Sequence, residues 1–234
     1  MSAPRASSAS TRPGQASGRT RSIVATLVIL VSWGVIFMAV RPFPPQFDLS
    51  PHKALGEILG AEAQKLCEPG SRIIVIVRDT QEEFKAPASE AQFTGFQQAL
   101  KKVGAKITTA HRFKIDPLRV VGVAGGDFLE VLRRCADNDV VVSFLGPPTL
   151  SEDQLVKLGN KRPKILAVCS GAMPQIVDLR KLFDQKLLNV AVISRSDVTR
   201  ADSGGNAAAF DRMFKLITPG NIADLQQSPA ATSP

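Results

Sequence analysis

The feature that most constrains this chain is an apolar run of eighteen residues, 23–40 (IVATLVILVSWGVIFMAV). It carries no charge, and only Thr26 and Ser32 interrupt it with polar groups. As an α-helix it would span about 27 Å, close to the roughly 30 Å hydrocarbon core of a bilayer. A single helix satisfies its own main-chain hydrogen bonds in lipid, so we expect one transmembrane helix and a water-exposed remainder.

The distribution of basic residues predicts how this helix is oriented. Four arginines stand before it and two basic residues follow closely: Arg5, Arg12, Arg19 and Arg21, then Arg41 and Lys53. Lys and Arg resist translocation, so residues 1–22 are expected in the cytoplasm and the domain outside it. We expect a single-pass protein of a bacterial inner membrane.

Two other interpretations of the N-terminal region remain open. A cleaved signal peptide would have an apolar region of about 7–15 residues and a small-x-small cleavage site, and the segment Phe37-Met38-Ala39-Val40 does not supply one. An organellar presequence would share the Ser, Ala and Arg of residues 1–22 and their lack of acids. An uncleaved anchor fits the length of the run better than either alternative.

The formal charge of +8 is concentrated before the domain. Residues 1–47 hold five Arg and no acid, which leaves 24 basic against 21 acidic residues in the remainder. The basic tail suits the anionic headgroups of a bilayer. No aromatic and basic platform of the kind that binds nucleic acid is present, so we predict no nucleic-acid partner.

Composition divides the chain into six segments. They are a disordered basic tail (1–22), the transmembrane helix (23–40), a Pro-rich spacer (41–49), a juxtamembrane helix (50–68), an α/β domain (70–224) and a disordered tail (225–234). Ser50 and Pro51 resemble an N-cap and first helical residue. Leu55 and Leu59 recur at helical spacing, and this stripe packs either on the domain or on a partner chain.

The domain alternates short apolar runs with helical periodicity. Strands are predicted at 72–77, 105–109, 140–145, 164–168 and 188–193, with a sixth at 214–217. Helices are predicted at 89–103, 127–136, 151–158 and 175–183, with a capping box at Ser151 and Gln154 before the third. Such alternation predicts an α/β fold with a doubly wound, mostly parallel sheet of five or six strands.

Residues 72–195 resemble one lobe of the periplasmic-binding-protein type I family, the module shared by sugar-binding proteins and related repressors. The resemblance rests on RIIVIVRDTQEEFKAPASEAQFTGFQQALKKVGAKITT and on FLEVLRRCADNDVVVSFLGPP. It implies a flavodoxin-like α/β unit. That family binds its ligand between two lobes, and this chain has residues for one.

Candidate ligand-binding residues follow the predicted strands, where open α/β sheets hold their ligands. They are Arg78, Asp79 and Thr80, then Ser143 and Gly146, then Cys169, Ser170 and Gly171. The competing interpretation is ordinary turn chemistry. No glycine-rich phosphate-binding motif and no C-x-x-C is present. We therefore predict no cofactor and no metal site.

A catalytic triad of Cys169, His111 and Asp116 was the strongest enzymatic alternative. In a sheet of order 2-1-3-4-5, the strands that carry His111 and Cys169 lie three spacings apart, roughly 14 Å. That distance excludes a nucleophile and base pair.

The sequence therefore predicts a non-catalytic, membrane-anchored module that binds a small ligand or an envelope protein. A homodimer could restore a two-sided cleft. A scaffold in a membrane complex, or a hydrolase that uses the strand ends, are the alternatives.

Overall fold

The computed structural model describes residues 23, 26–35, 48–79, 86–114, 122–195 and 205–225. The chain forms two compact units, Met1–Phe47 and Asp48–Pro234. In the first unit, residues 26–35 are helical. Within the described ranges, no helix has both the length and the apolar character needed to cross a membrane. The predicted tail at 1–22, all but the first residue of the predicted tail at 225–234, and residues 24, 25 and 36–47 lie outside these ranges.

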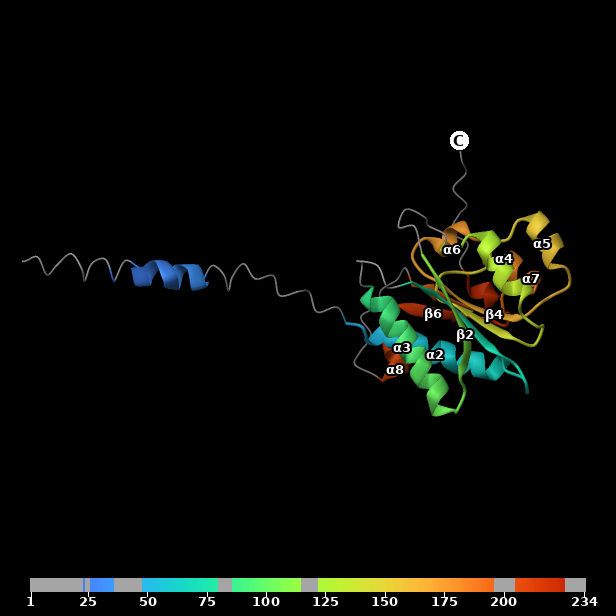
Figure 1. Cartoon of the computed structure of the whole chain (residues 1–234), viewed down its shortest axis with the longest axis horizontal. Helices are drawn as coiled ribbons and strands as arrows, with labels where there is room; N and C mark the ends of the chain where they lie inside the picture. The colour runs from blue at the N-terminus through green and yellow to red at the C-terminus, as the bar shows by residue number, and fades with distance from the viewer. Residues whose placement is uncertain are drawn as a thin grey trace, which may run out of the picture. The chain divides into compact units, whose positions relative to one another are not determined.

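The second unit is built on a six-stranded sheet with the strand order β2-β1-β3-β4-β5-β6 (Figure 1). The strands are β1 (Ile73–Arg78), β2 (Ile107–Phe113), β3 (Val140–Ser143), β4 (Lys164–Cys169), β5 (Val190–Ser194) and β6 (Phe214–Ile217). All neighbouring pairs are parallel except β5 and β6. The prediction of an α/β fold with a mostly parallel sheet is confirmed, and the sixth strand is its antiparallel edge.

Helices cover both faces of this sheet. On one face lie α2 (Ser50–Leu66), α3 (Pro87–Lys102) and α8 (Asn206–Asp211), and on the other lie α4 (Gly125–Arg133), α5 (Glu152–Leu158), α6 (Met173–Ile176) and α7 (Leu179–Asp184) (Figure 1). Strand β1 shows why. Val75 and Val77 face the α2 and α3 side, whereas Ile74 and Ile76 face the α4 side. A strand that is apolar at every position needs a helix on each face.

Helix α2 packs against both the sheet and α3. Leu55 and Leu59 are fully buried in the cluster formed with the sheet, so the stripe seen in the sequence is covered within the chain. The contact with α3 runs backbone to backbone at glycines. A Cβ at Gly56 would come within 1.9 Å of the Gln92 carbonyl oxygen, and one at Gly95 within 2.2 Å of the Lys53 carbonyl oxygen.

Helix ends show where local sequence signals succeed and fail. The capping box is confirmed, because the Ser151 hydroxyl accepts from the Gln154 N–H and the Gln154 side chain accepts from the Ser151 N–H. Ser50 was wrongly predicted as an N-cap. Leu49 holds that position, and the Asp48 carboxylate accepts from the Ser50 N–H at 2.9 Å.

Two helical segments differ from the prediction. The helix predicted at 175–183 is divided into α6 and α7, and the Asp178 carboxylate caps the start of α7 by accepting from the Lys181 N–H at 3.0 Å. Helix α8 was not predicted. It has six residues, fewer than two helical turns, which is too short to show a periodic pattern.

Candidate functional site

The strand order places a topological switch point between β1 and β3. Helix α3, which follows β1, packs on one face of the sheet, whereas α5, which follows β3, lies on the other. The two connections therefore diverge at the carboxyl ends of these neighbouring strands. This is the place where open α/β sheets bind ligands.

The end of β1 brings Arg78 and Asp79 to this point. Both are half-buried, and the Asp79 N–H donates to the Phe113 carbonyl oxygen at 2.9 Å, which fixes its main chain against the end of β2. Thr80, the third residue predicted here, lies outside the described residues. Arg78 and Asp79, two of the predicted ligand-binding residues, thus lie at the end of β1 beside the switch point.

The end of β3 is shaped by its own turn. The Ser143 side chain is fully buried, and its hydroxyl oxygen accepts from the Leu145 N–H at 3.3 Å. Gly146 has φ +104, and a Cβ there would come within 2.7 Å of the Met173 sulfur. In this structure both residues shape the turn that follows β3. This agrees with ordinary turn chemistry, the alternative to ligand binding at these positions.

The end of β4 separates its three candidates. Cys169 is fully buried, and burial raises the pKa of its thiol to about 12. Ser170 and Gly171 are exposed, and the Gly171 N–H donates to the Ser194 hydroxyl at 3.3 Å. Because only the thiolate is an effective nucleophile, Cys169 behaves as a core residue.

The observed strand order also separates the components of the suggested triad. Strands β2 and β4, which carry His111 and Cys169, are separated by β1 and β3. Three strand spacings are roughly 14 Å. Burial, and then the charge of Arg134, lower the pKa of His111. Asp116 lies outside the described residues.

The end of β5 carries two polar residues that were not among the predicted ones. Ser194 is the last residue of β5 and Arg195 follows it; both are half-buried, and the Ser194 hydroxyl accepts from the Gly171 N–H after β4. The Arg195 guanidinium donates to the Asp211 carbonyl oxygen at 3.0 Å. The same rule applied to the fifth predicted strand would have found them. Within the described ranges, no three His, Cys, Asp or Glu side chains gather as metal ligands would.

Comparison with known proteins gives structural neighbours alone. No family model and no curated protein matches the chain. One similar solved structure is a carbohydrate-transporter solute-binding protein from Agrobacterium radiobacter in complex with D-arabinose, at 13% identity over 76% of this chain and 61% of that chain, with a TM-score of 0.45. Another is an arabinose-binding protein from Geobacillus stearothermophilus, at 11% identity over 74% and 63%, with a TM-score of 0.48.

A third is an ABC-transporter solute-binding protein from Burkholderia graminis, also in complex with D-arabinose, at 14% identity over 73% and 60%, with a TM-score of 0.47. The chain thus spans about three fifths of the length of these proteins. At such low identity their ligands do not transfer to this chain. We therefore argue function from its own residues.

Proposed function

We propose that this chain is a membrane-anchored, non-catalytic module that binds a small polar ligand at the carboxyl ends of β1 and β3. The observation that carries the proposal is the divergence of α3 and α5 between these neighbouring strands. Arg78 and Asp79 supply a cation and a carboxylate there. Such groups suit hydroxyl and amide functions, which are the functional groups of a small polar solute.

The chemistry of the strand ends supports binding over catalysis. The Cys169 thiol is buried with its pKa raised to about 12, and the buried Ser143 hydroxyl contacts the main chain of its own turn. A nucleophile needs a base within hydrogen-bond reach. The nearest candidate in the earlier triad, His111, lies on a strand separated from β4 by two others.

Substitution of Asp79 by Ala is expected to weaken ligand binding at least tenfold. A charge-assisted hydrogen bond contributes roughly 1.5–3 kcal/mol, and Asp79 directly follows β1. The matched control is Glu82→Ala, which removes a carboxylate three residues further along the chain. Isothermal calorimetry on the full chain in detergent, against pentoses and hexoses that include D-arabinose, measures both. If the two variants bind like the parent, the strand-end site is wrong; if no small solute binds, the scaffold function takes its place.

Membrane anchoring is the second half of the proposal. It is supported by the uncharged run 23–40, by the four arginines that precede it, and by the helix at residues 26–35. A reporter fused after Leu225 tests it. We expect activity from an alkaline phosphatase, which folds only outside the cytoplasm, and no signal from a cytosol-only fluorescent protein. The reverse result would place the domain in the cytoplasm and contradict this topology.

A further inference from the structure

The two edges of the sheet are finished differently. Edge strand β6 has four residues. The Arg195 N–H donates to the Met213 carbonyl oxygen at 2.8 Å, so the main-chain groups of Met213 point toward β5. The direction of these groups alternates along a strand, so those of Leu216, three residues on, point away from β5. The Asn221 side chain donates to that outward Leu216 carbonyl at 2.9 Å and accepts from the Thr218 N–H at 2.6 Å. Asn221 thereby occupies one outward main-chain group near the end of this short strand.

Edge strand β2 is left open. It has seven residues, and all of them are exposed or half-buried. Figure 1 labels this strand in front of the other strands of the sheet. The Phe113 carbonyl accepts from the Asp79 N–H, so the main chain of Phe113, and by alternation that of His111 and Thr109, points to β1. The N–H and C=O groups of Ala110 and Arg112 therefore point outward. In the part of the chain that the structure describes, no strand pairs with this outer side.

The usable length of the β2 edge is set by a register irregularity. Ile73 pairs with Ile107, but Ile74 pairs with Thr109, so Thr108 is the extra residue of a bulge. From Thr109 to Phe113 the register is regular. A pairing partner would use this stretch, because a bulge interrupts the ladder of hydrogen bonds.

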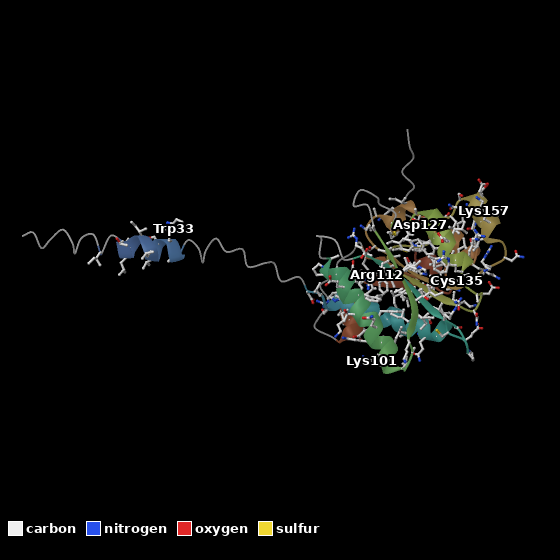
Figure 2. All side chains as sticks on the ribbon, viewed as in Figure 1. Trp33, Lys101, Arg112, Asp127, Cys135 and Lys157 are labelled. Carbon is white, nitrogen blue, oxygen red and sulfur yellow. The ribbon has the colours of Figure 1, made fainter. Side chains whose placement is uncertain are left out.

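We propose that β2 pairs in antiparallel fashion with β2 of a second copy of this chain, about a two-fold axis at His111. In this register Ala110 of one copy lies opposite Arg112 of the other, and each such pair exchanges two N–H···O bonds. His111 faces its own symmetry mate as a non-hydrogen-bonded pair. Thr109 lies opposite Phe113 on the same face. Arg112, labelled on β2 in Figure 2, faces alanine and not another cation.

Two properties of the chain favour a second copy over an unrelated peptide. The stretch from Thr109 to Phe113 is self-complementary. In the proposed register the β-branched Thr109 faces the aromatic Phe113, and no two like charges lie opposite each other. Among the described residues, β2 is also the longer of the two edge strands, with seven residues against four in β6. Because β2 of one copy pairs with β2 of the other, each β2 edge is used once, and pairing through it stops at two copies. This proposal does not rest on the ligand site at β1 and β3.

Cross-linking through a cysteine on the two-fold axis tests the register. In a non-hydrogen-bonded pair the Cα atoms lie about 4.5 Å apart, within the range that a disulfide spans, so His111→Cys should cross-link to itself. The matched control is Thr109→Cys on the same face. Its two copies would lie four residues apart along the strands, about 14 Å, which no disulfide spans. Both are made in full-length chain with Cys67→Ser, because Cys67 is half-buried, whereas Cys135 and Cys169 are buried.

With copper phenanthroline as oxidant, we expect His111→Cys to form covalent dimer at least tenfold faster than Thr109→Cys. Adding Ala110→Pro should slow it at least tenfold, because proline removes an outward N–H and leaves the ladder to β1 intact. Ala110→Val, which keeps that N–H, should have little effect. Three outcomes would each overturn the proposal. They are equal cross-linking rates for His111→Cys and Thr109→Cys, no cross-link for His111→Cys, and undiminished cross-linking of His111→Cys in a folded chain that also carries Ala110→Pro. The comparison of the two cysteines decides it even if the proline variant does not fold.

Discussion

Replacing Gly56 by Ala is expected to lower the free energy of unfolding of the second unit by about 3 kcal/mol, at the upper end of the cost of overpacking. The added Cβ would lie 1.9 Å from the Gln92 carbonyl oxygen and 2.7 Å from the Phe96 N. These are main-chain atoms of α3, so no side-chain rotation relieves the contact. Helix α2 would have to move away from α3 and expose part of the surface that Leu55 and Leu59 bury.

The matched control is Gly126→Ala in the first turn of α4. There a Cβ would meet only the Gln154 side-chain nitrogen, at 3.9 Å, an ordinary contact. Alanine favours a helix over glycine by up to about 1 kcal/mol, so this variant should be neutral or slightly stabilised. Urea unfolding followed by circular dichroism measures both. Equal stability of the two variants would show that α2 does not pack on α3 as described.

Replacing Asp139 by Ala is expected to lower the free energy of unfolding by about 2 kcal/mol, because it removes a buried carboxylate that accepts hydrogen bonds from two main-chain N–H groups and from the partly exposed Arg72 side chain. The Asp139 side chain is 1% exposed and accepts from the Arg72 guanidinium at 2.5 Å. It also accepts from the N–H groups of Arg72 at 3.0 Å and Ala136 at 2.7 Å. Its loss leaves these donors without their acceptor at the amino end of β1 and β3. Thermal or urea unfolding measures the effect.

The control for Asp139 is Glu130→Ala. Glu130 on α4 forms an ion pair with Arg134, the residue that directly follows this helix, but both side chains are about two thirds exposed. Exposed pairs one helical turn apart contribute about 0.3–0.5 kcal/mol. A loss of stability as large as that of Asp139→Ala would contradict the larger contribution assigned to the buried Asp139 carboxylate.

The Asp139 pair also makes stability depend on pH. Burial alone would raise the pKa of the Asp139 carboxyl, but hydrogen bonds from the Arg72 side chain and from the N–H groups of Ala136 and Arg72 lower it below its ordinary value. Its contribution is therefore complete above the unfolded pKa of about 3.9 and is lost as pH falls through the lower folded pKa. The stability difference between parent and Asp139→Ala should narrow below about pH 4.

Local pattern was enough to predict the six strands and most of the longer helices of this fold. Runs such as 165–168, apolar at successive positions, are typical of strands covered on both faces, and the structure has β4 at Lys164–Cys169. The capping box at Ser151 was predicted for the same kind of reason, since both of its hydrogen bonds join residues three apart in sequence.

The position of the candidate site depends on the strand order, and the predicted order of the first five strands is observed. Arg78 and Asp79 therefore lie at the end of β1 beside the switch point, and ligand binding by them stays a prediction. Sequence does not distinguish a side chain that faces the core from one that faces a ligand. Cys169 and Ser170 are neighbours after the same strand, yet one is buried and the other is exposed.

The sequence by itself determined the apolar run, the alternation of strands and helices, and hence the mostly parallel α/β sheet, because these follow from residue types within one window of the chain. Only the tertiary structure decided that Gly56 and Gly95 bring two helices into main-chain contact, that Asp139 pairs with Arg72, and that β2 and β6 are the edge strands of the sheet formed by the described residues. Each of the first two joins residues far apart in sequence, and the third depends on the order in which the strands pair. Contacts of that kind are set by how packed elements meet, which no local pattern records.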